Sequence, residues 1–278
     1  MVVLNRLLGC FALACVAAAP HLPCAAQVRQ ALVIGNAHYQ HVDALRNSVN
    51  DAELIAASLK QVGFQVTLLR DATLGQMSRA AVEFGRSLNR DDIGFVYFAG
   101  HGVQYGGENY LIPVDADVVL PDQLRQRAFP IGQLFASLPA DGRSSNIVVL
   151  DACRNNPFAG RSPAYSRALQ AGSSGARGQG SVDVPAGLSQ LDSVPGNTLI
   201  AYATSPGKVA LDGAGRNSPY AEALASVMLD EGLEVTAVFQ EATLQVKHST
   251  SFQQEPWMNW SLNSRVIFKK RKSNHIVF

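Results

Sequence analysis

One cysteine and one histidine are the residues of this sequence with the clearest chemical potential. Cys153 comes soon after the apolar run at residues 147–150, and His101 stands between two glycines after the apolar run at residues 93–99. A thiol attacks an amide carbonyl as its thiolate, and a free cysteine with a pKa of about 8.5 needs a neighbouring base or positive charge to form one. Histidine is the side chain best suited to that task near neutral pH. The two residues indicate nucleophilic catalysis, provided that the fold brings them together.

The elements that would position this pair follow a regular order along the chain. From residue 30 onward, short apolar runs alternate with amphipathic stretches, which is the pattern of strands crossed by helices. We expect strands at residues 31–35, 64–69, 93–99, 147–150 and 198–203, and helices at residues 50–59, 75–88, 219–229 and 235–247. Asn50 is the expected N-cap of the first helix, with Glu53 in the capping-box position. The order predicts an α/β fold with a mainly parallel sheet, in which His101 and Cys153 lie beyond the carboxyl ends of strands.

The composition is that of one sizeable domain with its own core. Of the 278 residues, 47% are hydrophobic and 16% are charged, and no apolar run after the N-terminus is long enough to span a membrane. The 23 Lys and Arg residues nearly balance the 22 Asp and Glu residues, so no general field draws the protein to nucleic acid or acidic lipid. Any specificity must come from a local site.

The N-terminus has the pattern of an export signal. Arg6 is the one charged residue before Gln27, and it precedes the apolar run at residues 7–19. This pattern predicts a secretory signal that is cleaved before Gln27, and hence a periplasmic or secreted protein. A lipoprotein-type cysteine at Cys15 or Cys24 and an uncleaved anchor are the alternatives.

Cleavage of the signal would leave a single cysteine. Cys10, Cys15 and Cys24 lie inside the expected leader, so Cys153 alone would remain. The mature chain then has no internal disulfide and no zinc-thiolate cluster, and we predict no metal site. A cysteine left over in this way is a candidate reactive thiol.

Two further segments have distinct compositions. Residues 160–191 are rich in Ser, Gly, Ala, Pro and Arg and are expected to form an exposed flexible loop, and residues 269–272 form a short basic run. The expected organisation is a signal peptide at residues 1–26, one catalytic domain at residues 27–265 that includes this loop, and a basic tail at residues 266–278.

Several motifs resemble those of a known group of peptidases. Residues 99–102 (AGHG) and 151–154 (DACR) are similar to the His and Cys boxes of the caspase and metacaspase clan. His101 precedes Cys153 by 52 residues, close to the roughly 50-residue spacing of caspases. Further matches follow the clan's order within residues 30–229: the opening strand at 32–36 (LVIGN), the first helix start at 50–52 (NDA) and the small-subunit strand at 201–207 (AYATSPG).

The resemblance implies both a fold and an activity. It implies a caspase-like three-layer α/β sandwich with a mainly parallel sheet of about six strands and helices on both faces. It also implies a cysteine endopeptidase of the bacterial metacaspase type, with Cys153 as nucleophile, His101 as base and later acid, and the backbone N–H of Gly102 in the oxyanion hole. No cofactor is implied, the substrate is a protein or peptide, and the oligomeric state stays open.

Carboxylates at three positions predict which bond is cut. Caspases that cut after aspartate line their pocket with arginines and a glutamine. Asp151 stands at the position of that glutamine, and Asp212, counted on from Tyr202, stands where the small subunit presents an arginine. Asp51 and Asp151 also match acidic residues that metacaspases place in this pocket. Carboxylates favour a basic side chain through charge-assisted hydrogen bonds, so we predict cleavage after Arg or Lys.

Other interpretations of these residues stay open. Asp51 is also a first-turn acid favoured by the helix dipole, Asp212 also suits a turn, and Arg46 could bring positive charge to the pocket. A non-catalytic caspase-like binding or signalling module is the main alternative function. A thiol-redox protein is disfavoured because the chain has no Cys-x-x-Cys pair.

The sequence departs from metacaspases at two positions, and these bear on calcium activation. Ala99 stands where metacaspases often have Ser, and Ser48 stands where they have Cys. Asp115 and Asp117 could join a calcium shell, but two carboxylates fall short of the six to eight oxygen ligands required. Calcium activation therefore stays an open question.

The loop at residues 160–191 lies where the clan is commonly cut between its large and small subunits. It contains Arg161, Arg167 and Arg177, which an enzyme that cuts after arginine could cleave in itself. A merely soluble connection is the alternative.

Overall fold

The computed structural model describes residues 27–139, 142–153, 156–158, 195–205 and 210–271, together with Tyr165, Leu188, Leu191 and Lys208. Of Cys153 only the backbone is described. The expected signal peptide, the arginines of the expected processing loop and the end of the expected tail from residue 272 lie outside the described residues.

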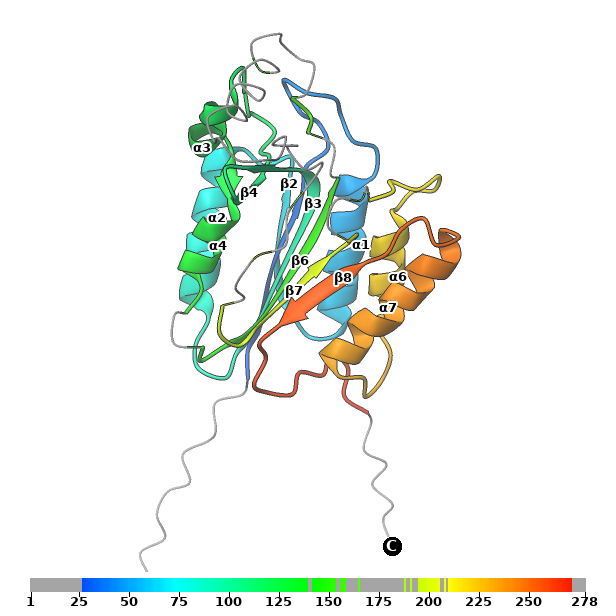
Figure 1. Ribbon diagram of the computed structural model, residues 1–278. Helices are drawn as coiled ribbons and strands as arrows, with labels where there is room; N and C mark the ends of the chain where they lie inside the picture. Colours follow the sequence, from blue (N-terminus) through cyan, green and yellow to red (C-terminus); the bar gives the residue numbers. More distant parts are fainter. Residues whose placement is uncertain are drawn as a thin grey trace, which may run out of the picture.

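A six-stranded sheet forms the centre of the molecule (Figure 1). Its order is β2-β1-β3-β6-β7-β8, and the first five of these strands are parallel to one another while β8 is antiparallel to β7. These strands are β1 (Arg29–Gly35), β2 (Gln65–Arg70), β3 (Ile93–Tyr105), β6 (Ser145–Cys153), β7 (Thr198–Tyr202) and β8 (Trp257–Trp260). Two short strands, β4 (Glu108–Leu111) and β5 (Phe129–Pro130), extend antiparallel from β3. The predicted mainly parallel sheet is confirmed.

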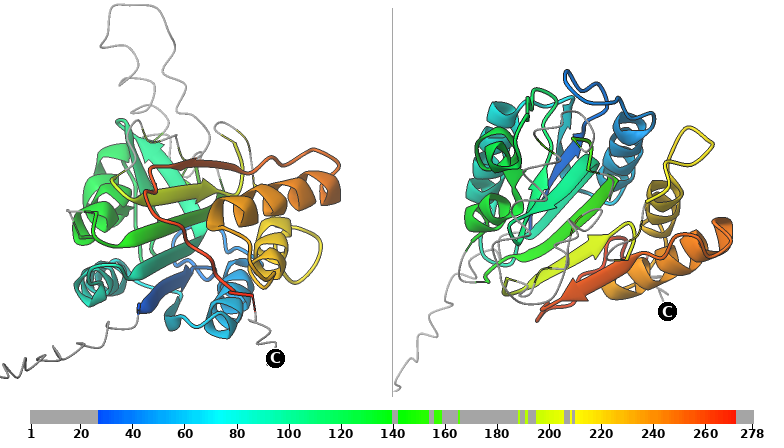
Figure 2. Two further views of the ribbon diagram at one scale, coloured as in Figure 1. Left: turned by 90° about the horizontal axis from the view of Figure 1, so that it is seen from below. Right: turned by 45° about the horizontal axis from the view of Figure 1, so that its top comes forward.

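Helices cover both faces of the sheet (Figures 1 and 2). One face carries α1 (Ser48–Gln61), α6 (Pro219–Val227) and α7 (Val235–Ser249), and the other carries α2 (Leu74–Ser87) and α4 (Ile131–Ser137). The short α3 (Leu124–Arg127) and a 3-10 turn at Pro121–Gln123 precede β5. The predicted three-layer arrangement is thus confirmed. In the described part of the chain, no helix is both long and apolar enough to cross a bilayer.

The core consists of two apolar layers separated by the sheet. Along β3, Phe95 and Tyr97 pack toward α1, α6 and α7, whereas Val96 and Phe98 pack toward α2 and α4. A strand buried on both faces is apolar at every position rather than at alternate ones, which explains the continuous apolar runs of the sequence.

The two central strands continue further than the sequence predicts. The expected strands end at residues 99 and 150, but β3 runs through His101 and β6 runs through Cys153. Glycine makes the continuation of β3 feasible, because a Cβ atom at Gly100 would lie 2.6 Å from the Tyr39 hydroxyl. His101 and Cys153 therefore lie within strands of the sheet rather than in the loops that follow those strands.

The predicted start of the first helix is wrong. The N-cap of α1 is Asn47, and Asn50 lies in the first turn, where its amide donates to the Arg216 carbonyl at 3.1 Å. Glu53 accepts a hydrogen bond from Arg70 at 2.8 Å instead of closing a capping box. Asn50 and Glu53, which the local pattern assigned to capping, thus form long-range contacts instead.

The predicted start of the C-terminal tail is also wrong. Val266 and Phe268 are each 2% exposed, and the Phe268 ring lies 5.9 Å from that of Phe95 and 6.0 Å from that of Phe64. Arg29 donates to the Ile267 carbonyl at 2.8 Å. This segment closes the core over the end of α1 and belongs to the folded domain.

Candidate active site

Neighbouring strands bring the histidine and the cysteine together. β3 and β6 are parallel, and their register places His101 directly opposite Cys153. Neighbouring strands are roughly 4.8 Å apart, so the two Cα atoms are close neighbours at the carboxyl end of the sheet. This juxtaposition results from two neighbouring parallel strands that carry His101 and Cys153 in register.

The contacts of His101 fix which ring nitrogen can act as a base. Its Nε2 atom lies 2.9 Å from the carbonyl oxygen of Asp43, which can only accept a hydrogen bond. Nε2 therefore carries the proton and Nδ1 presents its lone pair. Nδ1 is buried and has no hydrogen-bond partner among the described residues. Tyr39 supports the same residue, because its hydroxyl accepts from the His101 backbone N–H at 2.8 Å and its ring centroid lies 4.6 Å away.

Burial adjusts the basicity of this imidazole. His101 is 7% exposed, and burial lowers its pKa, while the Asp43 carbonyl and the carboxylates of Asp43 and Asp212 act in the opposite direction. A lowered pKa keeps the ring neutral at pH 7, which is the state that a general base requires.

Two buried carboxylates lie beside this pair. Asp51 is on α1 and Asp151 is on β6, two residues before Cys153. Asp151 Oδ2 accepts from the hydroxyls of Tyr97 at 2.7 Å and Ser218 at 3.1 Å. Asp51 Oδ1 accepts from the backbone N–H of Ser218 and the amide of Asn217, both at 2.9 Å. The N-terminus of α6 thus joins two acidic residues that are 100 positions apart.

Ionisation of either carboxyl group makes ionisation of the other less favourable. Burial raises the pKa of Asp51, and the nearby charge of Asp151 raises it further, to about 7. Burial also raises the pKa of Asp151 to about 6, against the hydrogen bonds from Tyr97 and Ser218 that lower it. Arg46 is exposed and is not among the charges that act on either group. Carboxyl groups whose pKa is raised by burial and by a nearby like charge are candidates for a functional site.

Asp212 lies close to the same groups. Its backbone carbonyl accepts from the amide of Asn47, and its carboxylate raises the pKa of both His101 and Asp151. The structure therefore brings together the three acidic residues that the sequence singles out, next to the histidine. Whether they bind a substrate side chain stays a prediction.

Gly102 lies in a position that excludes a side chain. It pairs with Leu111 of β4, and a Cβ atom here would lie 2.9 Å from Leu188 and 3.0 Å from the Cβ atom of Ala152. The close packing explains the glycine. Its role in an oxyanion hole stays a prediction.

The two candidate calcium ligands have contacts within the protein. Asp115 Oδ1 accepts from the backbone N–H of Leu74 at 3.0 Å, and Asp117 lies 3.9 Å from His41. No group of three or more metal-ligating side chains occurs in the part of the chain that the structure describes.

Several residues that complete the site are not among the candidates predicted from the sequence. These are Tyr39, Asp43, Asn47, Tyr97, Asn217 and Ser218. Ser218 had a usable signal, because it is a serine directly before Pro219 and caps α6 through Ala221 N–H at 3.1 Å. No sequence signal could have predicted the contact between Asp43 and His101, because it is made by the backbone carbonyl of Asp43.

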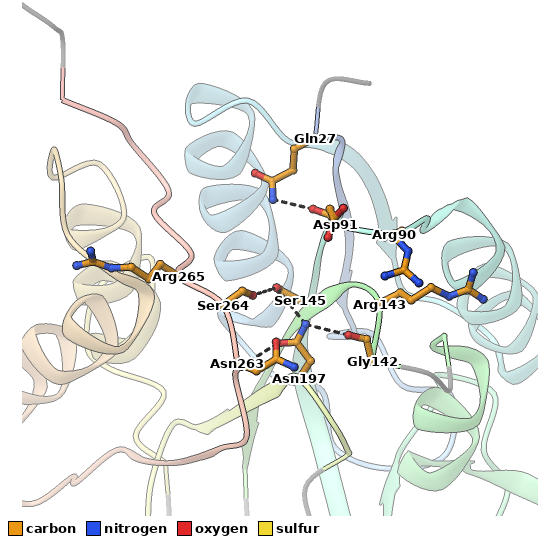
Figure 3. A pocket seen from close by; sticks show the side chains of 10 residues that line it. All are labelled: Gln27, Arg90, Asp91, Gly142, Arg143, Ser145, Asn197, Asn263, Ser264 and Arg265. Atoms are coloured by element: carbon orange, nitrogen blue, oxygen red, sulfur yellow. Dashed lines mark hydrogen bonds between the residues drawn. The ribbon is translucent and has the colours of Figure 1, made fainter. Parts of the chain in front are cut away.

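A separate cavity lies at the amino ends of the parallel strands (Figure 3). It has a volume of about 320 Å³ and is lined by Gln27, Arg90, Asp91, Gly142, Arg143, Ser145, Asn197, Asn263, Ser264 and Arg265. Asn197 donates to the Gly142 carbonyl at 3.2 Å, and the hydroxyls of Ser145 and Ser264 lie 2.6 Å apart. Several of its polar groups thus bond to one another, and Arg265 pairs with Glu234.

Comparison with known proteins defines the class to which this fold and site belong. The caspase domain family matches residues 28–267, so the chain belongs to that family and the predicted resemblance to the caspase clan is confirmed. Membership implies a cysteine peptidase that acts on proteins.

Two curated proteins are similar over part of the chain. They are mucosa-associated lymphoid tissue lymphoma translocation protein 1 of Homo sapiens and its homolog of Mus musculus, each 30% identical over 130 residues. The match covers 46% of this chain and 15% of each relative, so it reaches only a small part of their length.

Proposed function

We propose that this protein is a cysteine endopeptidase that hydrolyses peptide bonds after Arg or Lys, with Cys153 as nucleophile and His101 as general base. The observation that carries the proposal is the register of β3 and β6, which sets these residues opposite each other beside three carboxylates. The caspase domain supplies the class of reaction.

The proposed reaction uses the unprotonated nitrogen of His101. Nδ1 takes the thiol proton, and the sulfur attacks the substrate carbonyl carbon to form a tetrahedral oxyanion. Backbone N–H groups of Gly102 and Cys153 would stabilise that oxyanion. The intermediate collapses as the imidazolium gives its proton to the departing amine, which leaves an acyl-enzyme thioester. His101 then takes a proton from water, the hydroxide attacks the thioester, and the acid product and thiol are released.

The proposed specificity rests on the buried carboxylates. The hydrogen bonds from the described residues fall on Oδ1 of Asp51 and Oδ2 of Asp151. A guanidinium or ammonium group could bond to their second oxygens and would relieve the repulsion between two buried negative charges. An aspartate side chain would add to that repulsion. We therefore expect a strong preference for basic residues.

Fluorogenic peptides that differ only in the residue before the scissile bond test this proposal. The wild-type protein should cleave peptides ending in Arg and Lys and leave the Asp peptide uncut, and C153A should cleave none. Equal background from the wild type and C153A would contradict the proposal and favour a non-proteolytic binding or signalling module.

Two expectations about the whole chain are part of the proposal. We propose export through a cleaved signal at residues 1–26, and self-cleavage after Arg161, Arg167 or Arg177. N-terminal sequencing and intact-mass analysis of the purified active protein test both. An intact chain that begins at Met1 would contradict both.

A further inference from the structure

The segment between β1 and α1 carries two groups that orient His101. We call residues 36–46 the β1–α1 loop. Within it, the Asp43 carbonyl accepts from His101 Nε2 at 2.9 Å, and the Tyr39 hydroxyl accepts from the His101 backbone N–H at 2.8 Å. The Tyr39 ring also lies against the imidazole, with a centroid distance of 4.6 Å. This loop therefore sets both the tautomer of His101 and the direction of Nδ1.

One carboxylate holds the start of this loop. Asp71, directly after β2, accepts through Oδ1 from the backbone N–H groups of Ala37 at 2.8 Å and His38 at 2.9 Å. Its Oδ2 atom lies 2.7 Å from Nδ1 of His38. The Asp71 backbone N–H donates to the Gly35 carbonyl at 2.9 Å, which ties the end of β2 to the end of β1. Asp71 thus holds Ala37 and His38, next to Asn36, whose side-chain amide accepts from the Ala72 backbone N–H at 2.8 Å and donates to the Ile112 carbonyl at 3.0 Å.

The backbone at Asp71 is in an uncommon conformation. Its φ angle is 48°, in the left-handed region that non-glycine residues seldom adopt. Burial raises the pKa of Asp71, but the hydrogen bonds from His38 and Ala37 outweigh that effect and lower the pKa overall, so the group is ionised. A strained residue retained as the anchor of a loop beside a candidate active site suggests a functional constraint.

We infer that Asp71 is a positioning residue for His101, acting through the β1–α1 loop. The inference rests on the proposed function, because it assumes that His101 activates Cys153. Proton transfer depends on orientation, and small misplacements of a catalytic group cost up to roughly a hundredfold in rate. Release of the loop would let the imidazole turn while substrate binding by the carboxylates remains.

Thiol alkylation measures the state of Cys153 without a peptide substrate. We would measure the rate constant for alkylation of Cys153 by iodoacetamide at pH 6, kcat and KM for an Arg peptide, and the melting temperature. D71G removes the carboxylate and suits a positive φ. D71N keeps an oxygen that can accept from the two backbone N–H groups. D115A is the matched control, because Asp115 also accepts from a backbone N–H, at the start of α2 and outside the β1–α1 loop.

The expected result separates positioning from stability. D71G should lower the alkylation rate and kcat by roughly ten- to a hundredfold, with KM changed less than about twofold. D71N should restore most of the rate, and D115A should lower the melting temperature while the alkylation rate stays at the wild-type value. If D71G does not fold, D71S, which also lacks the carboxylate, carries the test, and its alkylation should be slower than that of the wild type.

Two results would overturn the inference in different ways. If H101A alkylates as fast as the wild type, then His101 does not activate Cys153, and the proposed function fails with the inference. If H101A is slow but folded D71G, or D71S in its place, matches the wild type, the positioning role alone is wrong. Losses in D71G and D115A that simply follow their melting temperatures would also contradict it.

Discussion

The two ends of the central sheet differ in how their polar groups are bonded. At the amino ends, neutral amides and hydroxyls such as those of Asn197 and Ser145 bond to one another around a cavity of about 320 Å³. At the carboxyl ends, ionisable groups are buried close together. His101 Nδ1 has no partner among the described residues, and the pKa of Asp51 is raised to about 7.

This difference in bonding, rather than the presence of a cavity, points to the carboxyl ends as the site of chemistry. Buried polar groups normally have partners, so a buried base that has none among the described residues is a candidate to bond to a reacting group. Amides and hydroxyls that line the cavity at the amino ends bond to one another, which resembles a structural network. At the carboxyl ends, burial of the Asp51 and Asp151 carboxyl groups and of the His101 base costs stability. Such an arrangement is typical of a site that acts on a ligand.

The largest expected effect is a loss of activity that occurs in variants at the carboxyl ends of the sheet and not in a variant at the amino ends. C153A and H101A should each lower kcat/KM for an Arg peptide by roughly a thousandfold or more, because the nucleophile and base act as one unit. S145A at the amino ends should change kcat/KM less than about twofold. Steady-state assays of the three variants check this, and a large loss in S145A would break the comparison.

The next effect concerns selectivity for basic residues. D151N should reduce kcat/KM for an Arg peptide by roughly thirtyfold, since loss of one desolvated charge partner costs about 2 kcal/mol or more. A matched citrulline peptide, which is neutral, should lose much less. Equal losses for both peptides would show that Asp151 only supports the fold.

A smaller effect is the pH dependence of that selectivity. The raised pKa values of Asp51 and Asp151 mean that both become ionised as pH rises through about 6 to 7. The ratio of kcat/KM for Arg over citrulline should therefore increase by about tenfold between pH 5 and pH 8. In D151N the increase should occur at lower pH, because the charge that raises the pKa of Asp51 is gone. A ratio independent of pH would contradict this.

The same groups predict a decrease in stability with rising pH. The pKa of Asp51 is higher in the folded state than its ordinary value of 3.8, so the folded protein binds more protons than the unfolded chain between these values. This group's contribution to the free energy of unfolding should fall by up to about 1.4 kcal/mol per pH unit between about pH 4 and pH 7. Urea unfolding of D51N should show a flatter dependence, and identical slopes would contradict the assignment.

The smallest effect on activity is expected from the amino ends. Asn197 has a φ angle of 55° and donates to the Ser144 carbonyl at 2.8 Å, so N197A should destabilise the protein by about 1–3 kcal/mol. Its kcat/KM should stay within about twofold of the wild type at a temperature where both are folded. Denaturant unfolding and an assay at 25 °C check the two parts.

The strands and the main helices could be predicted because they depend on local pattern. Each central strand is an unbroken apolar run, and the candidate catalytic residues follow those runs, so their meeting at one edge follows from a parallel sheet. The short β4, β5 and β8 were missed. Strands of two to four residues have too little periodicity to be recognised, and tertiary pairing decides them.

The contacts that complete the site could not be predicted from local pattern. Asp51 and Ser218 are 167 residues apart, and Asn47 bonds to a carbonyl 165 residues away. Polar residues such as Asn50 fit a local cap and a long-range bond equally well, and only the folded chain decides between them. Phe268 was assigned to a tail for a related reason, because a single aromatic residue beside a basic run shows no periodic pattern.

An active-site label gives the most direct test of the central claim that Cys153 and His101 act together beside an acidic pocket. A peptide chloromethyl ketone ending in Arg should form one adduct, in which sulfur replaces chloride, and peptide mapping should find it on Cys153. The adduct should form far more slowly in H101A and with a reagent ending in Asp. Labelling that is equally fast in H101A, or equally fast with the Asp reagent, would contradict the account.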